Sequence, residues 1–404
     1  MDNAGVVANH ASRRRLVVLL AIAFAAIALL AWRWITAPNV EPLLAKARRD
    51  WTANAFAADQ NLERAIDAAD GSLPLGHLLR CRLRLELQRP ADAIAYIDAF
   101  GEAMAEDPVG LLDLAAAARS MTQPDVAARL ATLVPAGTPH RAEALRLAVS
   151  AELDLGMLEP ALRHAEEWSN TEPSNPEAKL ATARVQRRQS RLIPSIHTCR
   201  EAVRIATALP GPDQNASGDS TIANSALREL VELLVTARDA EGARQAFDQL
   251  ADRTSDRDEL TLMEAYILRL EGSPDEALAK VERACQSRPQ SIEARFLRSV
   301  ILIDAKRFAD ASNELKQVVR REPFHKEAHY KLALALQRLG QIDAASEHFN
   351  TSARLTKLAE EQLALQGQVT NTPDPAKYRR LAEISAALGR DREAAFWRSQ
   401  ADAK

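Results

Sequence analysis

Two patterns of apolar and polar residues stand out along the chain. The first is an uninterrupted apolar run, Leu16–Trp32, which contains seventeen residues without a charge. The second is an arrangement of small residues, prolines and apolar residues that recurs every 34 residues from about residue 40 to the C-terminus. The run predicts one membrane-spanning helix, and the recurrence predicts an array of short helices.

The apolar run has the length and the flanks of a transmembrane helix. About 17 to 20 helical residues cross a hydrocarbon core at roughly 1.5 Å per residue. Trp32 and Trp34 lie at the end of the run, where indole rings favour the membrane–water interface, and Arg33 can extend its guanidinium toward the headgroups. We therefore predict a transmembrane signal-anchor helix at residues 16–35, which contacts the lipid bilayer.

The charges around the run predict its orientation. Three arginines, residues 13–15, precede it, whereas the basic residues that follow are more dilute. By the positive-inside tendency, residues 1–15 form a short cytoplasmic tail and the repeat array lies outside the cytoplasm, as in a single-pass inner-membrane protein. A cleaved signal peptide is the alternative, because Ala23-Phe24-Ala25 matches a small-x-small cleavage pattern. The seven apolar residues after Ala25 favour the retained anchor.

The recurring pattern keeps a 34-residue step over most of the chain. The step lengthens to 48 residues after the repeat that starts at residue 176 and to 49 after the repeat that starts at 326. The first excess contains the turn-forming stretch LPGPDQNASGDS, and the second continues through KLAEEQLALQG, which predicts a lengthened helix. The predicted repeats start near residues 40, 74, 108, 142, 176, 224, 258, 292, 326 and 375.

Prolines and small residues fall where a pair of packed helices needs them. Twelve of the nineteen prolines lie at predicted helix boundaries, and proline is tolerated in the first turn of a helix but costs about 3 kcal/mol in its interior. A small residue also recurs where two helix backbones must approach closely. These small residues are Ala93, Ala127, Ala161, Ser195, Ala243, Ala277, Ala311, Ala345 and Ala394.

This pattern resembles the tetratricopeptide repeat, a 34-residue pair of antiparallel helices. The chain departs from the family pattern in that the large early residue of the first helix is often missing, and only Phe247 and Phe349 occupy the aromatic position of the second helix. The resemblance implies an all-α fold, a right-handed α-solenoid of stacked helix-turn-helix (TPR-like) repeats. The transmembrane helix predicted from the apolar run precedes this solenoid. In this family the first helix of each repeat lines the inner surface.

The repeat frame sets the predicted domain organisation. The predicted parts are the cytoplasmic tail (1–15), the signal-anchor helix (16–35), a degenerate first repeat or linker (40–73), a first block of repeats (74–205), a loop insertion (206–223), a second block (224–356), an insertion that extends a helix (357–374) and a terminal capping repeat (375–404). Because the anchor and the repeats occupy nearly the whole sequence, no room is left for a catalytic domain.

The net charge and the absence of known motifs argue against a nucleic-acid partner and against catalysis. The net charge of −3 gives no reason to expect a nucleic-acid partner. The sequence contains no glycine-rich phosphate-binding loop, no G-x-S-x-G and no C-x-x-C. Cys81, Cys199 and Cys285 lie in repeats that are not neighbours, which predicts free thiols rather than a disulfide. We therefore predict no cofactor and no enzymatic activity.

One histidine cluster leaves a metal-binding alternative open. His325 and His329 lie close in sequence, and His348 falls in the partner helix of the same repeat. The acidic residue between the first two has the wrong offset for the H-E-x-x-H zinc motif. A metal-binding protein that uses the His325 and His329 region is therefore the less favoured alternative.

The inner surface is the predicted partner-binding site. Arginines form 42 of the 52 basic residues, and a guanidinium pairs with carboxylates in a bidentate manner. Several glutamates, Glu229 and Glu232 among them, lie near enough in the frame to neutralise some of these arginines. The predicted binding residues are Arg82, Arg119, Arg146, Arg184, Arg187, Arg228, Tyr266, Arg269, Phe296, Tyr330 and Arg379.

The sequence thus predicts a membrane-anchored scaffold or adaptor that binds a protein or peptide partner, including an acidic segment, in its concave groove. An assembly factor or chaperone for a membrane or envelope complex, such as cytochrome or secretion-machine biogenesis, is the alternative function.

Overall fold

The computed structural model describes residues 40–208, 222–254, 257–369 and 374–402. The predicted signal-anchor helix at 16–35 and most of the predicted insertion at 206–223 lie outside these ranges. Among the described residues, no helix combines the length and the apolar character that a membrane span requires.

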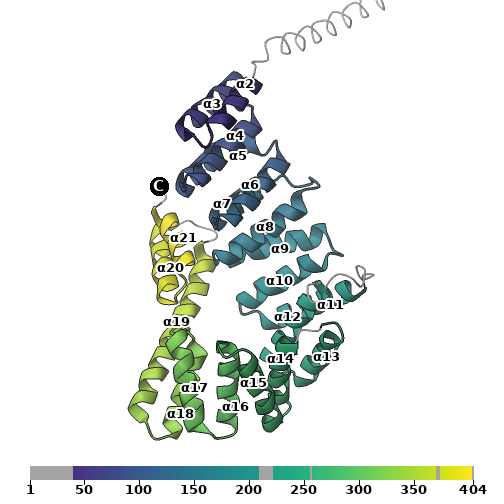
Figure 1. Ribbon diagram of the computed structural model, residues 1–404, viewed down its shortest axis with the longest axis vertical. Helices are drawn as coiled ribbons and strands as arrows, with labels where there is room; N and C mark the ends of the chain where they lie inside the picture. Colours follow the sequence, from purple (N-terminus) through teal and green to yellow (C-terminus); the bar gives the residue numbers. More distant parts are fainter. Residues whose placement is uncertain (1–39, 209–221, 255–256, 370–373, 403–404) are drawn as a thin grey trace, which may run out of the picture. The chain divides into compact units, whose positions relative to one another are not determined.

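The described residues form twenty helices and no strand (Figure 1). They divide into two compact units, one before and one after the boundary between His140 and Arg141. The first unit contains α2 (Val40–Asp50), α3 (Ala55–Ala68), α4 (Pro74–Glu86), α5 (Pro90–Met104), α6 (Pro108–Ser120) and α7 (Pro124–Leu133). The all-helical repeat fold expected from the sequence is confirmed for this described part of the chain.

The second unit continues the same alternation of helices. It contains α8 (Arg141–Asp154), α9 (Leu158–Thr171), α10 (Pro176–Arg188), α11 (Leu192–Ala208), α12 (Ile222–Thr236), α13 (Ala240–Ala251), α14 (Arg257–Leu270), α15 (Pro274–Ser287), α16 (Ile292–Asp304), α17 (Phe308–Arg321), α18 (Lys326–Arg338), α19 (Ile342–Val369), α20 (Pro375–Ala387) and α21 (Asp391–Asp402).

Consecutive helices pair into hairpins, from α2 with α3 to α20 with α21. The first helix of every hairpin begins within two residues of a repeat start predicted from the sequence. Proline occupies the first turn of α4, α5, α6, α7, α10, α15 and α20, where its missing N–H leaves no hydrogen bond unmade. Helix boundaries in this fold therefore follow directly from the residues that cannot continue a helix.

The recurring small residues lie between the two helices of nine hairpins, from α4–α5 to α20–α21. All nine of them, from Ala93 to Ala394, are between 0 and 2% exposed. A side chain no larger than a methyl or hydroxymethyl group lets the helix backbones approach closely, and Ser195 donates its hydroxyl to the carbonyl of Ala183 at 2.8 Å. The one polar member of the series is thus satisfied within the core.

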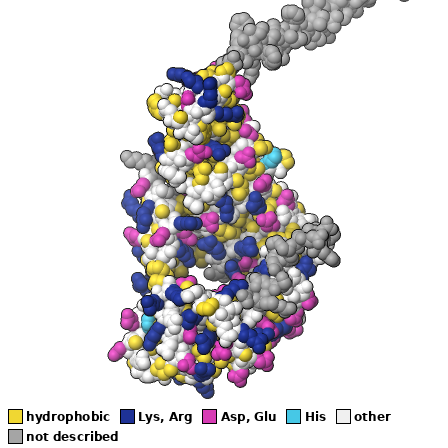
Figure 2. Space-filling model, viewed as in Figure 1, with side chains coloured by type: hydrophobic (Ala, Val, Ile, Leu, Met, Phe, Trp, Pro, Cys, Tyr) yellow, Lys and Arg dark blue, Asp and Glu magenta, His cyan; other side chains and the backbone are white. Residues whose placement is uncertain are grey.

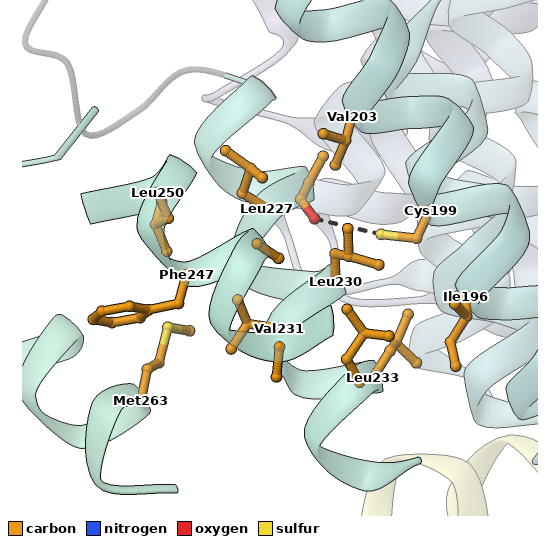
Figure 3. Close-up of a cluster of buried hydrophobic side chains, with 14 of the residues drawn as sticks. Ile196, Cys199, Val203, Leu227, Leu230, Val231, Leu233, Phe247, Leu250 and Met263 are labelled. Atoms are coloured by element: carbon orange, nitrogen blue, oxygen red, sulfur yellow. Dashed lines mark hydrogen bonds between the residues drawn. The ribbon is translucent and has the colours of Figure 1, made fainter. Parts of the chain in front are cut away.

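The core of the second unit is continuous from α11 to α12. Ile196, Cys199 and Val203 of α11 pack against α12, and Phe247 of α13 and Met263 of α14 extend the same cluster (Figure 3). The Cys199 thiol lies 3.4 Å from the carbonyl oxygen of Ala226. The described chain on either side of residues 209–221 therefore packs as adjoining hairpins.

The three cysteines are free. Cys81 and Cys199 are fully buried, and burial raises the pKa of each thiol to about 12. Cys285 is half-buried. The thiols of Cys81 and Cys199 are therefore structural rather than nucleophilic, because the thiolate is the reactive form of cysteine.

Helix α19 is twice as long as most second helices, with 28 residues where α9, α15 and α17 have 14 each. It leads to α20 and α21, which pack beside the turn between α8 and α9. Leu155 from that turn joins Val369, Leu381, Phe396 and Trp397 in one buried cluster. The last hairpin of the second unit therefore contacts its first hairpin.

Candidate functional site

The first helices of successive hairpins in the second unit form one face, which we call the inner face. Helices α10, α12, α14, α16 and α18 each contact the next in this series, whereas the neighbouring second helices lie farther apart. An array whose first helices are closer together curves toward them. Most of the predicted binding residues lie on these helices, and Arg82 and Arg119 lie on α4 and α6 of the first unit.

Four charged residues dominate the inner face where α10 meets α12. Arg184 Nε lies 3.3 Å from a carboxylate oxygen of Glu229, and Arg187 Nε lies 3.0 Å from the other oxygen. Arg187 also reaches Glu232 at 2.6 Å. Because the Glu229 side chain is only 7% exposed, two guanidinium groups offset its burial. This part of the face is balanced in charge rather than basic.

Tyr266 lies further along the inner face, on α14. It is half-buried, and burial raises the pKa of its hydroxyl, with the nearby carboxylates of Glu293, Glu327 and Glu232 adding to the increase. Those carboxylates belong to α16, α18 and α12, so they converge on Tyr266 from both directions along the face. Arg269, one turn after Tyr266, donates to Asp304 at 2.6 Å.

Two aromatic residues predicted for the groove have different surroundings. Phe296 is partly buried in the core, and its ring centroid lies 4.7 Å from that of His325. Tyr330 is 46% exposed and meets the edge of Phe349 at 5.7 Å between centroids. Tyr330 therefore offers a rigid, accessible ring, whereas Phe296 contributes mainly to packing.

The remaining predicted arginines differ in their partners. Arg82 bonds to Glu86 at 2.8 Å, and Arg146 lies 3.4 Å from Glu143, each on its own helix. Arg119 and Arg228 are half-buried and have partners. Arg379 is exposed and has no ion pair among the residues that the structure describes. Most of the predicted basic residues are thus already engaged with carboxylates.

Figure 2 shows the same mixture over the face it displays, where basic and acidic side chains are interspersed and do not separate into patches. A partner with many acidic residues would have to compete with the carboxylates of the protein for these guanidinium groups.

The histidine cluster is engaged in hydrogen bonds. His329 Nε2 lies 3.1 Å from the carbonyl oxygen of Pro323, and its Nδ1 lies 3.0 Å from His348 Nδ1. His325 Nδ1 accepts a hydrogen bond from the backbone N–H of Ala328 and so caps α18. Within the described part of the chain, no group of three or more His, Cys, Asp or Glu residues is arranged to hold a metal ion. The geometry gives the metal-binding alternative no support.

A groove on the first unit was not predicted from the sequence. It has a volume of about 510 Å³ and lies between α3, α4 and α5, with Phe56, Leu87 and Phe100 exposed along it. Arg84 lies over the ring of Tyr96, 4.3 Å from its centroid, and near Asp59 at 3.4 Å. Its aromatic residues come from two helices, α3 and α5, with Leu83, Arg84 and Leu87 between them, so no single helical stripe indicated it.

Comparisons with known proteins agree with the helical array. Family models described as tetratricopeptide repeat match residues 268–325, 302–369 and 217–292. A tetratricopeptide repeat protein from Parabacteroides merdae ATCC 43184 is similar over 65% of this chain and 99% of its own, with 12% identity and a TM-score of 0.53. A human IFIT1 dimer is similar over 81% of this chain and 90% of its own, with 16% identity and a TM-score of 0.43. At 12% identity, the first of these two similarities concerns the fold alone.

Proposed function

Because this chain is a tetratricopeptide repeat protein, we propose that it is a non-catalytic scaffold that binds a protein or peptide partner on the inner face of its second unit. We further propose that residues 16–35 hold it in a membrane with the repeat array outside the cytoplasm.

The exposed ring of Tyr330 is the observation that carries the binding proposal. It stands on a first helix, supported from behind by Phe349, and a fixed aromatic ring supplies contact area with little loss of conformational entropy. The Arg269–Asp304 pair joins α14 to α16, the first helix that precedes α18 on the inner face. Such a surface suits recognition by shape and hydrogen bonding.

A photo-crosslinking amino acid at Tyr330 tests the binding proposal in the full chain, expressed in its own membranes. We expect a discrete crosslinked adduct from position 330. Ile193 is the matched control, because it is 73% exposed on the second helix α11. Adducts of equal yield from both positions, or from position 193 alone, would contradict the assignment of the inner face.

The arginine–glutamate pairs test whether the partner is acidic. The substitution Glu229→Gln removes the carboxylate shared by Arg184 and Arg187, so an acidic probe such as hexaglutamate should bind about fivefold more tightly. Glu271→Gln is the control, because Glu271 pairs with Arg244 of the second helix α13 at 2.8 Å. Calorimetric titration at two salt concentrations measures the effect. Equal affinities of the two variants would count against an acidic partner.

Thiol labelling in intact cells tests the membrane orientation. In a Cys285→Ser chain, Ile193→Cys should react with a membrane-impermeant maleimide, whereas Ala4→Cys in the predicted cytoplasmic tail should be protected until the membrane is opened. The reverse pattern would place the repeats in the cytoplasm, and labelling of both would indicate that the segment does not span.

A further inference from the structure

In the second unit, the last hairpin contacts the first two hairpins, through the turn between α8 and α9 and through Arg188 at the end of α10. In a solenoid each repeat contacts only its neighbours. Here Arg188 and Glu393, 205 residues apart, form a hydrogen bond of 3.3 Å. We call this contact the seam, and define it by Leu155, Gly156 and Arg188 on one side and Phe396, Trp397 and Glu393 on the other.

The carboxylate of Glu393 is the polar centre of the seam. Its side chain is 7% exposed, and it accepts hydrogen bonds from Arg188 of α10 and, at 2.9 Å, from Gln362 of α19. Gln362 in turn accepts from Arg390 at 2.8 Å, and Arg188 also donates to the carbonyl of Leu153 at 2.7 Å. One buried charge therefore connects the two ends of the unit.

Gly156 allows the close approach at the seam. Its φ is +71°, and a Cβ atom placed there would lie 2.8 Å from the carboxyl carbon of Glu393. The backbone turn between α8 and α9 thus covers the carboxylate directly, and no side chain fits between them.

The seam also covers apolar side chains of the α20–α21 hairpin. The side chains of Phe396 and Trp397 are 9 and 4% exposed, because the seam buries them against Leu155. Helix α19, about 40 Å long at its 28 residues, carries the hairpin to this position.

The seam borders a pocket that is open to solvent. The pocket has a volume of about 300 Å³, and both sides of the seam contribute to its walls. Its lining includes Met157, Glu159, Arg163, Val369, Tyr378 and Trp397. An interface made of a small apolar cluster and one polar network beside an open pocket has few close contacts to lose when it separates.

We propose that the seam is a latch: the C-terminal hairpin docks, as in this structure, and undocks as a folded unit at the end of α19. When the hairpin is docked, it joins the two ends of the second unit, and the inner face can bind only an extended peptide segment of the partner. When the hairpin is undocked, the two ends separate, and the inner face can bind a bulkier partner. This use of the latch rests on the proposed function, whereas the motion itself does not.

Distances between spin labels test the latch in the full chain without any partner. Labels at the exposed residues Glu166 of α9 and Arg398 of α21, in a Cys285→Ser background, report the gap across the seam. We expect one short distance in the otherwise unchanged protein. Gly156→Ala and Glu393→Gln should each add a longer distance and raise the ratio of undocked to docked molecules by about tenfold.

Two matched variants separate the latch from general destabilisation. Gly272→Ala imposes the same backbone strain, with φ +82°, but no atom lies within 4 Å of its Cβ. Glu314→Gln removes a carboxylate that is 15% exposed and paired with Arg295 and Arg298 inside the array. In both control variants, the labels at residues 166 and 398 should show only the short distance.

A second label pair, at Ala376 and Arg398, distinguishes undocking from unfolding, because its distance stays short while α20 and α21 remain a hairpin. The proposal is overturned if the seam variants leave the distance unchanged, if the controls change it equally, or if the hairpin itself comes apart. None of these outcomes depends on the Tyr330 crosslink, so the latch proposal and the binding-face proposal can be refuted independently of each other.

Discussion

The turn inside a hairpin places one residue in the left-handed backbone region. Among the described residues, nine hairpin turns have such a residue, and only four of the nine are glycine. The others are Gln88, Thr122, Ser190, Arg238 and Lys306, with φ between 58 and 60°. The turn geometry therefore persists even where the side chain disfavours it, because the packing of the two helices requires it.

Gly272 isolates the backbone contribution to stability at such a turn. With φ +82° and no atom within 4 Å of the added methyl group, Gly272→Ala should lower the free energy of unfolding by about 1 kcal/mol through strain alone. Gly367→Ala in helix α19 also has free space, and should instead raise stability by about 0.5–1 kcal/mol. Urea unfolding of both variants measures the contrast, and effects of equal sign would refute it.

A polar side chain at the fourth residue of a first helix ties that helix to the turn before it. His77 Nε2 lies 3.1 Å from the carbonyl oxygen of Gly71, Arg295 donates to Pro289 at 3.2 Å, and His329 Nε2 lies 3.1 Å from the carbonyl oxygen of Pro323. In each case the acceptor lies six residues earlier. The three repeats thus share one hydrogen bond from the fourth residue of the first helix to the preceding turn. Because the side chains that make it differ, the sequence alone does not reveal it.

His348, which faces His329, makes this region sensitive to pH. Burial lowers the pKa of His348 below its usual 6.5, and His329 and Lys316 lower it further, whereas Glu347 opposes them. The unfolded chain then binds more protons than the folded one as the pH falls through 6.5, so stability decreases on acidification. His348→Gln should lose less stability between pH 7.5 and 5.5 than the unchanged protein does. The exposed His197 provides the control substitution, His197→Gln, in thermal unfolding at both pH values.

The helices themselves are positioned by the small residues at their crossings. Ala311 of α17 is fully buried, and a leucine there would force the hairpin apart. Ala311→Leu should therefore cost about 1–3 kcal/mol or more. Ala309 lies on the same helix but is exposed, so Ala309→Leu should change stability by less than about 0.5 kcal/mol. A cost of similar size at both positions would show that the crossing does not depend on residue size.

The helical frame could be predicted from sequence because proline and small residues mark its boundaries and crossings locally. Pro74, Pro108 and Pro176 begin helices where the frame required, and Ala93 and its equivalents are buried. The residue types of the inner face followed from the same frame. The frame also placed Glu229 and Glu232 near these arginines, but it did not indicate that both would pair with Arg187, because the two glutamates lie in the next hairpin.

The contacts that close the second unit could not be predicted in this way. Leu155 and Trp397 are separated by more than two hundred residues and carry no periodic signal. The curvature that brings them together is the sum of small rotations between hairpins, and no local pattern encodes that sum. The sequence indicated a longer helix after residue 342 but gave no reason for its length.

The contact between the two ends of the second unit should determine which helices lose stability when a residue at one end is mutated. Leu381 of α20 is fully buried in the cluster that contains Leu155. Leu381→Ala should therefore lower hydrogen-exchange protection in α20, α21 and the turn between α8 and α9, while α12 to α15 stay protected. A purely linear array would confine the loss to the C-terminal hairpins. Unchanged exchange between residues 153 and 160 would mean that the seam contributes no stability.

Helix α19 fixes both a distance and an angle for the hairpin that follows it. Removing one residue would draw α20 and α21 in by about 1.5 Å and turn them by about 100° around the helix axis. Removing seven would restore the heading to within about 20° but leave the hairpin roughly 10 Å short. The direction of the C-terminal hairpin should therefore depend periodically on the number of residues deleted from α19. A relative in which this helix has a different length must have a different rotation between its other hairpins if its last hairpin is to dock in the same way.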